Sequence, residues 1–302
     1  MTTKQVNLPS RKSKPDNRVA FLMLAPALIL LGIFVIWPLI YSWIVSFFQW
    51  SFYEESIFVG FNNFRMVLTD PVFRESIGRV LIFSLIVVPV MLVLAFLFAN
   101  LVKAMGRRTA TLLKVSIYIP TVISAVIASI VFVLIYEFRQ GILNWMLSLI
   151  GLSNVPWLGT ARTAPYALTV PAIWLGLGLA SLIMLAGLLD VPDNYYEAAQ
   201  IDGASWWQRT IHITLPLMRN IILYLLVTGF VASLQQFELP LIMTIGGPVQ
   251  STLFPNLHLF LRFTNDLYVG YSIAGALLLF LVLGGLSAVI FRVISSEKAV
   301  DA

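Results

Sequence analysis

The sequence predicts an all-α, polytopic membrane protein with six transmembrane helices and both termini in the cytoplasm. Three observations lead to this prediction: the composition, the spacing of apolar segments, and the distribution of Lys and Arg. Hydrophobic residues make up 59% of the 302 residues and charged residues 11%, whereas soluble domains carry about 25% charged residues. The mean hydropathy of +0.91 also excludes an ordinary soluble domain.

Six apolar windows are long enough to cross a membrane. A helix crosses the roughly 30 Å hydrocarbon core of a bilayer with about 20 apolar residues. Spanning β-strands instead need about ten residues of alternating polarity, a pattern that this sequence lacks. A formal charge, Glu238, occurs in the fifth window and in none of the others. The predicted spans are residues 19–43, 80–102, 115–136, 166–189, 221–246 and 269–291.

Lys and Arg set the predicted orientation, because cytoplasmic loops are enriched in these residues. The N-terminal tail, the second and fourth connections and the C-terminal end would share one side, with Lys4, Arg11, Lys12, Lys14, Arg18, Lys103, Arg107, Arg108, Lys114, Arg209, Arg219, Arg292 and Lys298. The opposite side would carry fewer cations, namely Arg65, Arg74, Arg79, Arg139, Arg162 and Arg262.

The more basic side is therefore predicted to be cytoplasmic, which divides the chain into three parts. Residues 1–18 form a cytoplasmic tail, residues 19–293 a six-helix transmembrane domain, and residues 294–302 a second cytoplasmic tail. The first tail is too long for the n-region of a cleaved signal peptide, so we expect the first span to be retained. The net charge of +5 follows from this topology and does not predict a nucleic-acid partner.

Motifs for catalysis and for metal binding are missing from the sequence. The absence of cysteine excludes disulfides, thiolate nucleophiles and cysteine metal sites. His212 and His258 lie far apart, without the spacing of metal ligands. No G-x-x-x-x-G-K-[ST], H-E-x-x-H or G-x-S-x-G motif occurs. We therefore expect neither an enzyme nor a cofactor bound to this chain.

Residues 190–219 form a polar segment between the fourth and fifth predicted spans. Asp193 is expected to cap a helix that begins near Asn194. Glu197 would then lie in the first turn of that helix, where the helix dipole favours a carboxylate. Gly203 can adopt the left-handed conformation that ends a helix. The segment is thus predicted to turn sharply on the cytoplasmic side.

A second short helix is expected after this turn. Ser205 stands three residues before Gln208, which is the spacing of a capping box, and Pro216 suits the first turn of the next span. Two interpretations of the segment remain open: an amphipathic linker resting on lipid headgroups, or an elbow that docks a partner. Room for a partner would come from the small residues Ala198, Ala199, Gly203 and Ala204.

The same segment resembles the EAA loop of binding-protein-dependent ABC importer permeases. Glu197-Ala198-Ala199 is followed after three residues by Gly203, and after nine more by the I-x-L-P pattern at residues 213–216. Both spacings match that family. The resemblance implies a coupling helix that sits in a cleft of a separate ATPase subunit. It implies polar contacts from Glu197, a turn at Gly203, and a close fit at the alanines; the ATPase-coupling residues would be Glu197, Ala198, Ala199, Asp202, Gly203 and Ala204.

The stretch "FELPLIMTIGGPVQST" at residues 237–252 resembles the sugar branch of that family, which includes maltose-like and glycerol-3-phosphate-like systems. Thr244, Gly246, Gly247 and Pro248 match the branch pattern, while Glu238 stands where an Asp is usual. The resemblance implies import of a carbohydrate across a bacterial or archaeal cell (inner) membrane. Its implied partners are a second homologous permease, two ATPase subunits that bind the ATP, an extracytoplasmic solute-binding protein and membrane lipid. Glycerol-3-phosphate or another polar solute is the alternative cargo.

Three polar residues in the fifth predicted span are candidates for the substrate path. A carboxylate inside a membrane is costly, so Glu238 is a functional candidate by default. Gln235 and Gln236 carry amides that can both donate to and accept from sugar hydroxyls. Each of the three also has a structural interpretation, as a bridge to a neighbouring helix. A channel or secondary transporter with Glu238 as its ion site is the rival functional class.

Four further residues in the spans predict packing and bends. Gly178 lies among large residues and is expected to allow two helices to approach closely. Pro89, Pro120 and Pro171 interrupt three of the spans and predict a bent bundle.

Overall fold

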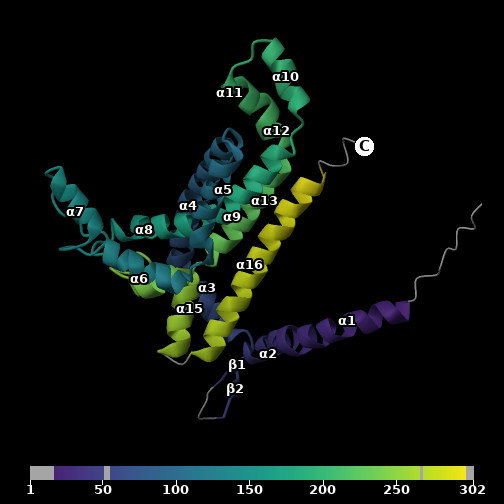
Figure 1. The fold of residues 1–302 in the computed structure, drawn as a ribbon. Coiled ribbons are helices and arrows are strands. Elements are labelled where there is room, and N and C mark those ends of the chain that lie inside the picture. Colours follow the sequence, from purple (N-terminus) through teal and green to yellow (C-terminus); the bar gives the residue numbers. More distant parts are fainter. Residues whose placement is uncertain (1–16, 51–54, 266–267, 297–302) are drawn as a thin grey trace, which may run out of the picture.

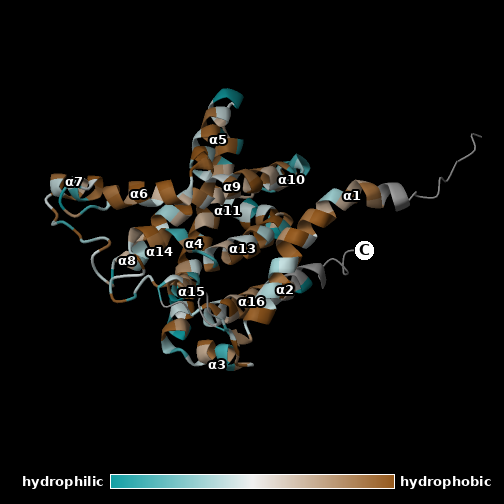
Figure 2. Ribbon diagram, turned by 90° about the horizontal axis from the view of Figure 1, so that it is seen from below, coloured by the Kyte–Doolittle hydropathy of each residue, from teal (hydrophilic) through white to brown (hydrophobic). Residues whose placement is uncertain are grey.

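A computed structural model describes residues 17–50, 55–265 and 268–296 of the chain. The described part is almost entirely helical, as predicted, with one two-stranded sheet. The helices form an elongated bundle in which α9, α13 and α16 run side by side (Figure 1). Hydrophobic residues make up most of the helices, and hydrophilic residues gather toward helix ends such as those of α5 and α10 (Figure 2).

The first span consists of α1 (Asn17–Leu31), a π-helical segment (Gly32–Ile36) and α2 (Trp37–Val45). Together they give an apolar stretch, Phe21–Val45, whose most apolar window has no residue buried within this chain. This stretch projects away from the rest of the molecule (Figure 1). A fully apolar helix without intramolecular burial must be covered by lipid or by another protein.

A small hairpin follows the first span and ties it to the next helix. Strand β1 (Phe48–Gln49) pairs antiparallel with β2 (Ile57–Phe58), and α3 (Asn62–Thr69) comes directly after. Gly60 has a φ of +57° and forms a turn between β2 and α3. The buried amide of Asn63 donates to the carbonyls of Ser46 and Phe48, each at 2.9 Å. These two bonds hold the hairpin against the start of the bundle.

Three helices build the centre of the bundle: α4 (Pro71–Lys103), α9 (Thr169–Leu189) and α13 (Arg219–Leu234). Small residues on α4 and α9 allow close packing, because Ala95, Ala99 and Ala180 are almost fully buried among larger side chains such as Met184. The 33 residues of α4 give a helix about 50 Å long. It therefore extends beyond the hydrocarbon thickness of a bilayer.

The third predicted span, residues 115–136, is not one continuous helix, in line with the bend expected from Pro120. The chain forms α5 (Arg107–Val122) and α6 (Ala125–Ile135), which meet at 98°. Ile123 and Ser124 between them have ψ values of 134° and 138°, and Ser124 caps α6 by accepting from the amide of Val126 at 3.2 Å. Pro120 lies three residues before the break. Hydropathy sums side-chain polarity and carries no information on this backbone turn.

The close approach predicted at Gly178 is confirmed. A Cβ at this position would collide with the carbonyl oxygen of Ile117, the hydroxyl of Thr121 and the Cα of Tyr118 on α5. Helices α5 and α9 therefore pack with backbone against backbone. The expected proline bends differ from one another, because Pro89 lies inside the unbroken α4 and Pro171 inside α9, whereas Pro120 precedes the sharp bend.

Shorter helices surround these central ones. After α6 come α7 (Ile142–Leu149) and α8 (Ala164–Ala167), which lie to one side of the bundle (Figure 1). The fifth predicted span is interrupted, since α13 ends at Leu234 and α14 (Glu238–Met243) begins after a break of three residues. The chain then continues through α15 (Pro255–Thr264) into α16 (Val269–Ser296).

Four helical stretches of the described residues are long and apolar enough to cross a membrane, or five if the bent pair α5–α6 counts as one span. They are Phe21–Val45, Pro71–Lys103, Ala164–Leu189 and Arg219–Met243. An apolar stretch in α16, Val269–Gly285, is shorter. The prediction of a helical membrane protein is thus confirmed, with four to five spans by these criteria.

Candidate functional site

The polar segment at residues 190–219 folds as two short helices joined by a sharp turn. Helix α10 (Asp193–Ile201) ends at Asp202, and Gly203 follows with a φ of +73°. The amide of Ala204 donates to the carbonyl of Ala199 at 2.9 Å, and that of Gly203 to Gln200 at 3.1 Å. This pair of bonds is a Schellman motif, which satisfies the free carbonyls at the end of a helix. The predicted turn at Gly203 is confirmed.

Ser205 begins the second helix, as the capping-box spacing predicted. Its side chain accepts from the amide of Gln208 at 3.4 Å, and its own amide donates to the side chain of Gln208 at 2.7 Å. Helix α11 (Trp206–Arg209) continues through a π-helical segment (Thr210–Thr214) into α12 (Leu215–Leu217). Pro216 lies in the first turn of α12, directly before α13. Sequence and local structure agree throughout this half of the segment.

The predicted cap at the start of α10 is wrong. Pro192 occupies the N-cap position, and Asp193 is the first helical residue, with no side-chain capping bond. Because the helix starts one residue early, Glu197 lies beyond its first turn. Pro192 has a φ of −62° and a ψ of 134°, so the chain enters the helix directly after this proline. Asp193 still benefits from the helix dipole, since it lies in the first turn.

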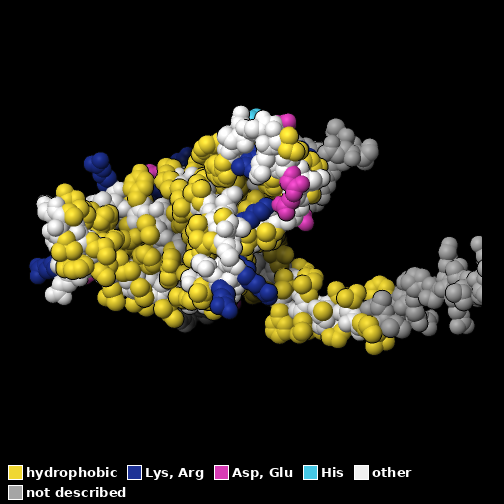
Figure 3. Space-filling view, turned by 45° about the horizontal axis from the view of Figure 1, so that its top comes forward, with side chains coloured by type: hydrophobic (Ala, Val, Ile, Leu, Met, Phe, Trp, Pro, Cys, Tyr) yellow, Lys and Arg dark blue, Asp and Glu magenta, His cyan; other side chains and the backbone are white. Residues whose placement is uncertain are grey.

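The hairpin of α10 and α11 projects from one end of the bundle (Figure 1). Most acidic side chains visible in Figure 3 gather on this projecting lobe, and hydrophobic side chains cover much of the remaining surface. Ile201 is 87% exposed and Trp207 is 65% exposed. Among the predicted coupling residues, Ala199 and Ala204 are half-buried; Glu197, Ala198, Asp202 and Gly203 are exposed.

Lys103 anchors this hairpin to the bundle. Its ammonium group lies 4.8 Å from the ring centroid of Tyr196, 3.4 Å from the carbonyl oxygen of Leu188, and 3.8 Å from the carboxylate of Asp193. Tyr196 in turn bonds Thr214 at 3.0 Å. One side chain at the end of α4 thus contacts the end of α9 and the start of α10. Sequence reasoning treated Lys103 as a topology signal and missed these contacts.

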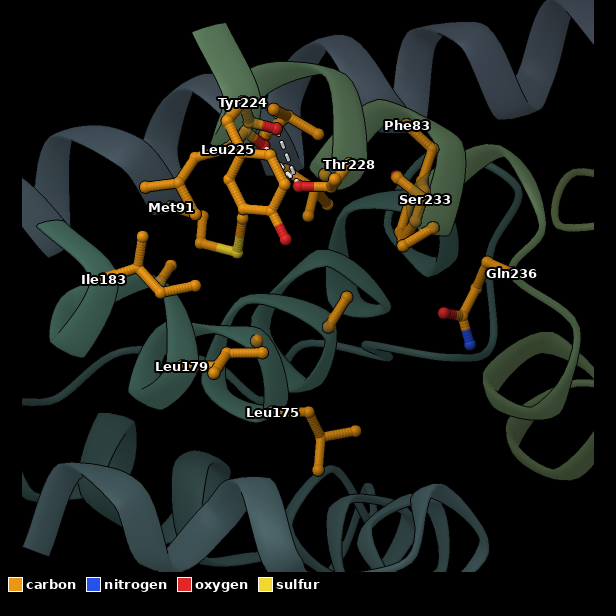
Figure 4. Close-up of a pocket in the computed structure, with 17 residues that line it drawn as sticks. Phe83, Met91, Leu175, Leu179, Ile183, Tyr224, Leu225, Thr228, Ser233 and Gln236 are labelled. Atoms are coloured by element: carbon orange, nitrogen blue, oxygen red, sulfur yellow. Dashed lines mark hydrogen bonds between the residues drawn. The ribbon is translucent and has the colours of Figure 1, made fainter. Parts of the chain in front are cut away.

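A cavity of about 390 Å³ lies between α4, α9 and α13 (Figure 4). Its volume falls within the usual range of small-molecule sites. The walls are largely apolar, with Met91, Leu175, Leu179 and Ile183 on α4 and α9. The polar groups in its lining come mainly from the fifth predicted span: Tyr224, Thr228, Ser233 and Gln236.

The three candidate path residues do not lie together. Gln236 lines the cavity, whereas Gln235 and Glu238 are exposed outside its lining. All three stand at the break between α13 and α14, where Gln235 caps α13 and Glu238 is the first residue of α14. The carboxylate of Glu238 therefore lies in the first turn of α14, where the helix dipole favours negative charge.

The Thr-x-Gly-Gly-Pro stretch forms a compact loop after α14. The hydroxyl of Thr244 bonds that of Thr252 at 2.7 Å, and Thr252 donates to the carbonyl of Gly247 at 2.8 Å. Gly246 has a φ of +80°. Because Ile245, Val249 and Gln250 also have positive φ values, this loop stores backbone strain of a kind that clusters at functional sites.

A buried polar cluster lies at the other end of α4. Asp70 caps this helix by accepting from the amides of Val72 at 2.8 Å and Phe73 at 3.4 Å. The same carboxylate accepts from the hydroxyl of Tyr271 at 2.7 Å and lies 3.2 Å from Nε2 of His258. Burial alone would raise the pKa of Asp70. The hydrogen bonds from Tyr271, Val72 and Phe73 and the nearby His258 together lower it by more, so the pKa of Asp70 lies below its usual value. Sequence reasoning did not identify this cluster.

Residues 91–298 match the family described as "Binding-protein-dependent transport system inner membrane component". The sulfoquinovosyl glycerol transport system permease protein of Agrobacterium fabrum is 31% identical over 287 residues, covering 93% of this chain and 92% of the relative. The trehalose/maltose transport system permease protein of Thermococcus litoralis is 32% identical over 249 residues, covering 82% of this chain and 83% of the relative.

Two solved structures share the fold. One is a bacterial alginate ABC transporter in complex with a periplasmic protein that carries an alginate pentasaccharide. The matched chain has a TM-score of 0.79 and 23% identity, over 91% of this chain and 93% of that one. The other is a bacterial ABC transporter involved in import of the acidic polysaccharide alginate. Its TM-score is 0.77 at 26% identity, over 93% of this chain and 96% of that one.

Proposed function

The chain belongs to the family of binding-protein-dependent transport system inner membrane components, and we propose that its α10–α11 hairpin couples a separate ATPase to sugar passage through the cavity beside α13. It is a permease subunit of a sugar ABC importer in the cell's inner membrane. It is a transport subunit and not an enzyme, and ATP hydrolysis belongs to a separate ATPase. The observation that carries the coupling role is the exposed helical turn at Gly203.

The proposed topology has six spans, with both termini in the cytoplasm. The bent pair α5–α6 supplies the third span and α16 the sixth, in addition to the four candidate spans named above. The abundance of Lys and Arg near the ends of α4, α5 and α16 supports the orientation. Residues 1–18 and 294–302 are cytoplasmic tails in this proposal, and residues 19–293 form the membrane domain. The α10–α11 hairpin then faces the cytoplasm.

The coupling contact is proposed to lie on the exposed surface of the hairpin. Glu197 and Asp202 offer carboxylates to the ATPase, and exposed apolar groups such as Ile201 add area that loses contact with water on docking. The space beside Gly203 is open. A close approach by a partner surface is therefore possible at Ala198, Ala199, Gly203 and Ala204.

Lys103 explains how motion of the hairpin would reach the membrane helices. It links α10 to the ends of α4 and α9, and both of these helices line the cavity. A rigid-body displacement of the hairpin would thus change the position of two cavity walls. Nucleotide biases the states of the cavity only if the docking contacts differ between those states.

The proposed cargo is a carbohydrate, because the similar permeases from Agrobacterium fabrum and Thermococcus litoralis are named for sugar transport. The lining supports this choice. An amide from Gln236 and hydroxyls from Tyr224, Thr228 and Ser233 are groups that bond sugar hydroxyls, and apolar walls fit the faces of sugar rings. Glycerol-3-phosphate or another polar solute remains the alternative cargo.

The importer needs partners that this chain does not contain. A periplasmic binding protein accompanies a transporter of the same fold, and we propose a solute-binding protein that delivers sugar to the outer face here. A second homologous permease and two ATPase subunits complete the proposed assembly. Membrane lipid and the second permease are the proposed surroundings of the apolar stretch Phe21–Val45.

The rival proposal, a channel or secondary transporter with Glu238 as ion site, has less support. Glu238 is exposed at the start of α14 and does not line the cavity. Uptake by Glu238→Gln across a pH series separates the two classes. A secondary transporter would lose its pH dependence, whereas an ATP-driven importer would keep its pH profile.

Replacement of Gly203 tests the coupling role. Proline requires a φ near −65° and cannot adopt +73°, whereas asparagine tolerates the left-handed conformation. In the reconstituted complex, Gly203→Pro should leave membrane insertion intact but uncouple uptake from ATP hydrolysis. Gly203→Asn should retain most uptake. Normal uptake by Gly203→Pro would rule out the proposed coupling.

A further inference from the structure

A second, smaller pocket of about 230 Å³ lies between residues 79–86 of α4, the chain at and just before α8, and the loop after α14. Two arginines, Arg79 and Arg162, line it together with Ser251. The remaining lining is mostly apolar, including Ile82, Ile86 and Pro165. Arg79 is half-buried and Arg162 is exposed, so an anion beside Arg79 and the apolar walls is bound more strongly than in open water.

Arg79 keeps part of its hydrogen-bonding capacity unused. Its Nη2 pairs with the carboxylate of Glu75 at 2.6 Å, but its buried Nη1 has no hydrogen-bond partner. The hydroxyl of Ser251 in the same lining is also buried and unpartnered. Buried donors without partners are rare, and each costs free energy unless a ligand or water satisfies it.

Arg162 supplies a charge that remains uncompensated. Within the part of the chain that the structure describes, it forms no ion pair, while Glu75 already neutralises Arg79. The pocket therefore carries an excess of about one positive charge and at least two free donors. Arginine offers its donors in a planar fork that matches the oxygens of a carboxylate.

The position of this pocket connects it with the cavity beside α13. Phe83 lines both. Along α4, Arg79, Phe83, Val87 and Met91 follow at intervals of four residues, which places them along one side of the helix. Arg79 lines the small pocket, and Val87 and Met91 line the larger cavity. A group held at Arg79 thus lies about one helical turn from the start of the proposed sugar path.

We propose that the pocket of Arg79, Arg162 and Ser251 binds the carboxylate of an acidic sugar on its way into the cavity beside α13. The inference rests on the proposed function and narrows its substrate class from sugars to sugars that carry an anionic group. The pocket is smaller than the roughly 300 Å³ at the lower end of ligand sites. It therefore suits one charged group of the solute, while the larger cavity holds sugar rings.

Binding of two probes to the purified importer complex tests this proposal. Glucuronate and glucose differ mainly in one carboxylate, so thermal unfolding with each probe isolates the anion. We expect glucuronate to raise the unfolding temperature, glucose to have little effect, and added salt to reduce the shift. Arg162→Gln and Arg79→Gln should each weaken glucuronate binding about tenfold. Arg74→Gln is the matched control, because Arg74 is exposed on the same helix outside this lining.

Three results would overturn the proposal: no shift with glucuronate, equal shifts with both probes, or a glucuronate shift that survives Arg162→Gln. A further measurement identifies the other source of a carboxylate. If Arg162→Gln weakens docking of the solute-free binding protein and glucuronate causes no shift, the pocket receives an acidic side chain of that protein instead. A different result would contradict the proposed function itself: the wild-type complex would import no sugar in the presence of ATP, whatever its response to glucuronate.

Discussion

The hydroxyl of Tyr271 donates a 2.7 Å hydrogen bond to the carboxylate of Asp70, although the two residues lie 201 positions apart. Asp70 is at the same time the N-cap of α4, and Tyr271 lies in the first turn of α16. The bond therefore fastens the start of the longest helix to the last one. His258 on α15 contacts both residues, at 3.2 Å and 3.1 Å. Three helices thus meet at one carboxylate.

Tyr271→Phe is expected to destabilise the protein in a pH-dependent manner. The pKa of Asp70 is lowered in the folded protein, so its stabilising effect is complete above the unfolded value of about 3.9 and declines as the pH falls below it. Loss of the Tyr271 bond should cost about 1–3 kcal/mol at pH 7. Thermal unfolding of wild type and variant at pH 7 and near pH 3.5 checks this. A deficit of the same size at both pH values would contradict the role of the ionised carboxylate.

Gly178→Ala is expected to loosen the contact between α5 and α9. The added methyl group collides with backbone atoms of Ile117 and Tyr118, which cannot move without shifting a helix. Overpacking of this kind costs about 1–3 kcal/mol. Gly78→Ala on α4 is the matched control, since its Cβ would meet open space. It should be neutral or stabilise by up to about 1 kcal/mol. Equal unfolding temperatures for both variants would count against the close approach.

Lys103→Ala is expected to weaken coupling without affecting insertion. The cation–π contact with Tyr196 and the pair with the exposed Asp193 together contribute about 1 kcal/mol. Such a loss corresponds to about a fivefold change in an equilibrium. Sugar molecules imported per ATP hydrolysed should therefore fall in the reconstituted complex. Arg108→Ala, at an exposed position near the start of α5, should retain the wild-type ratio. A normal ratio in Lys103→Ala would show that the anchor is dispensable.

Gln236→Ala and Gln235→Ala form a matched pair of neighbouring amides. Gln236 lines the cavity and Gln235 does not. Removal of one hydrogen bond to a sugar costs about 0.5–1.5 kcal/mol, or roughly two- to tenfold in affinity. Gln236→Ala should raise the KM for sugar uptake by this factor, and Gln235→Ala should leave it unchanged. The reverse order of effects would place the sugar path elsewhere.

Local features of the fold and of the hairpin could be predicted from the sequence. The turn at Gly203 and the capping box of Ser205 depend on residues only a few positions apart. A bend in the span of Pro120 was predicted, but its angle of 98° was not, because apolar residues continue on both sides of it. The contacts of Lys103 with Tyr196 and of Asp70 with Tyr271 join distant segments. No periodicity in the chain connects such positions, so they emerge only when the helices pack.

The projecting hairpin also bears on how much of this subunit a cell can accumulate. Ile201 and Trp207 are exposed in the isolated chain, and the α10–α11 hairpin projects from the bundle (Figure 1). Before the other subunits of the importer assemble with it, the exposed hairpin would be accessible to proteases, and its exposed apolar side chains would favour aggregation. Subunits made in excess would therefore be degraded. The amount of the other importer subunits, and not the rate at which this permease is synthesised, would set the steady-state amount of the permease.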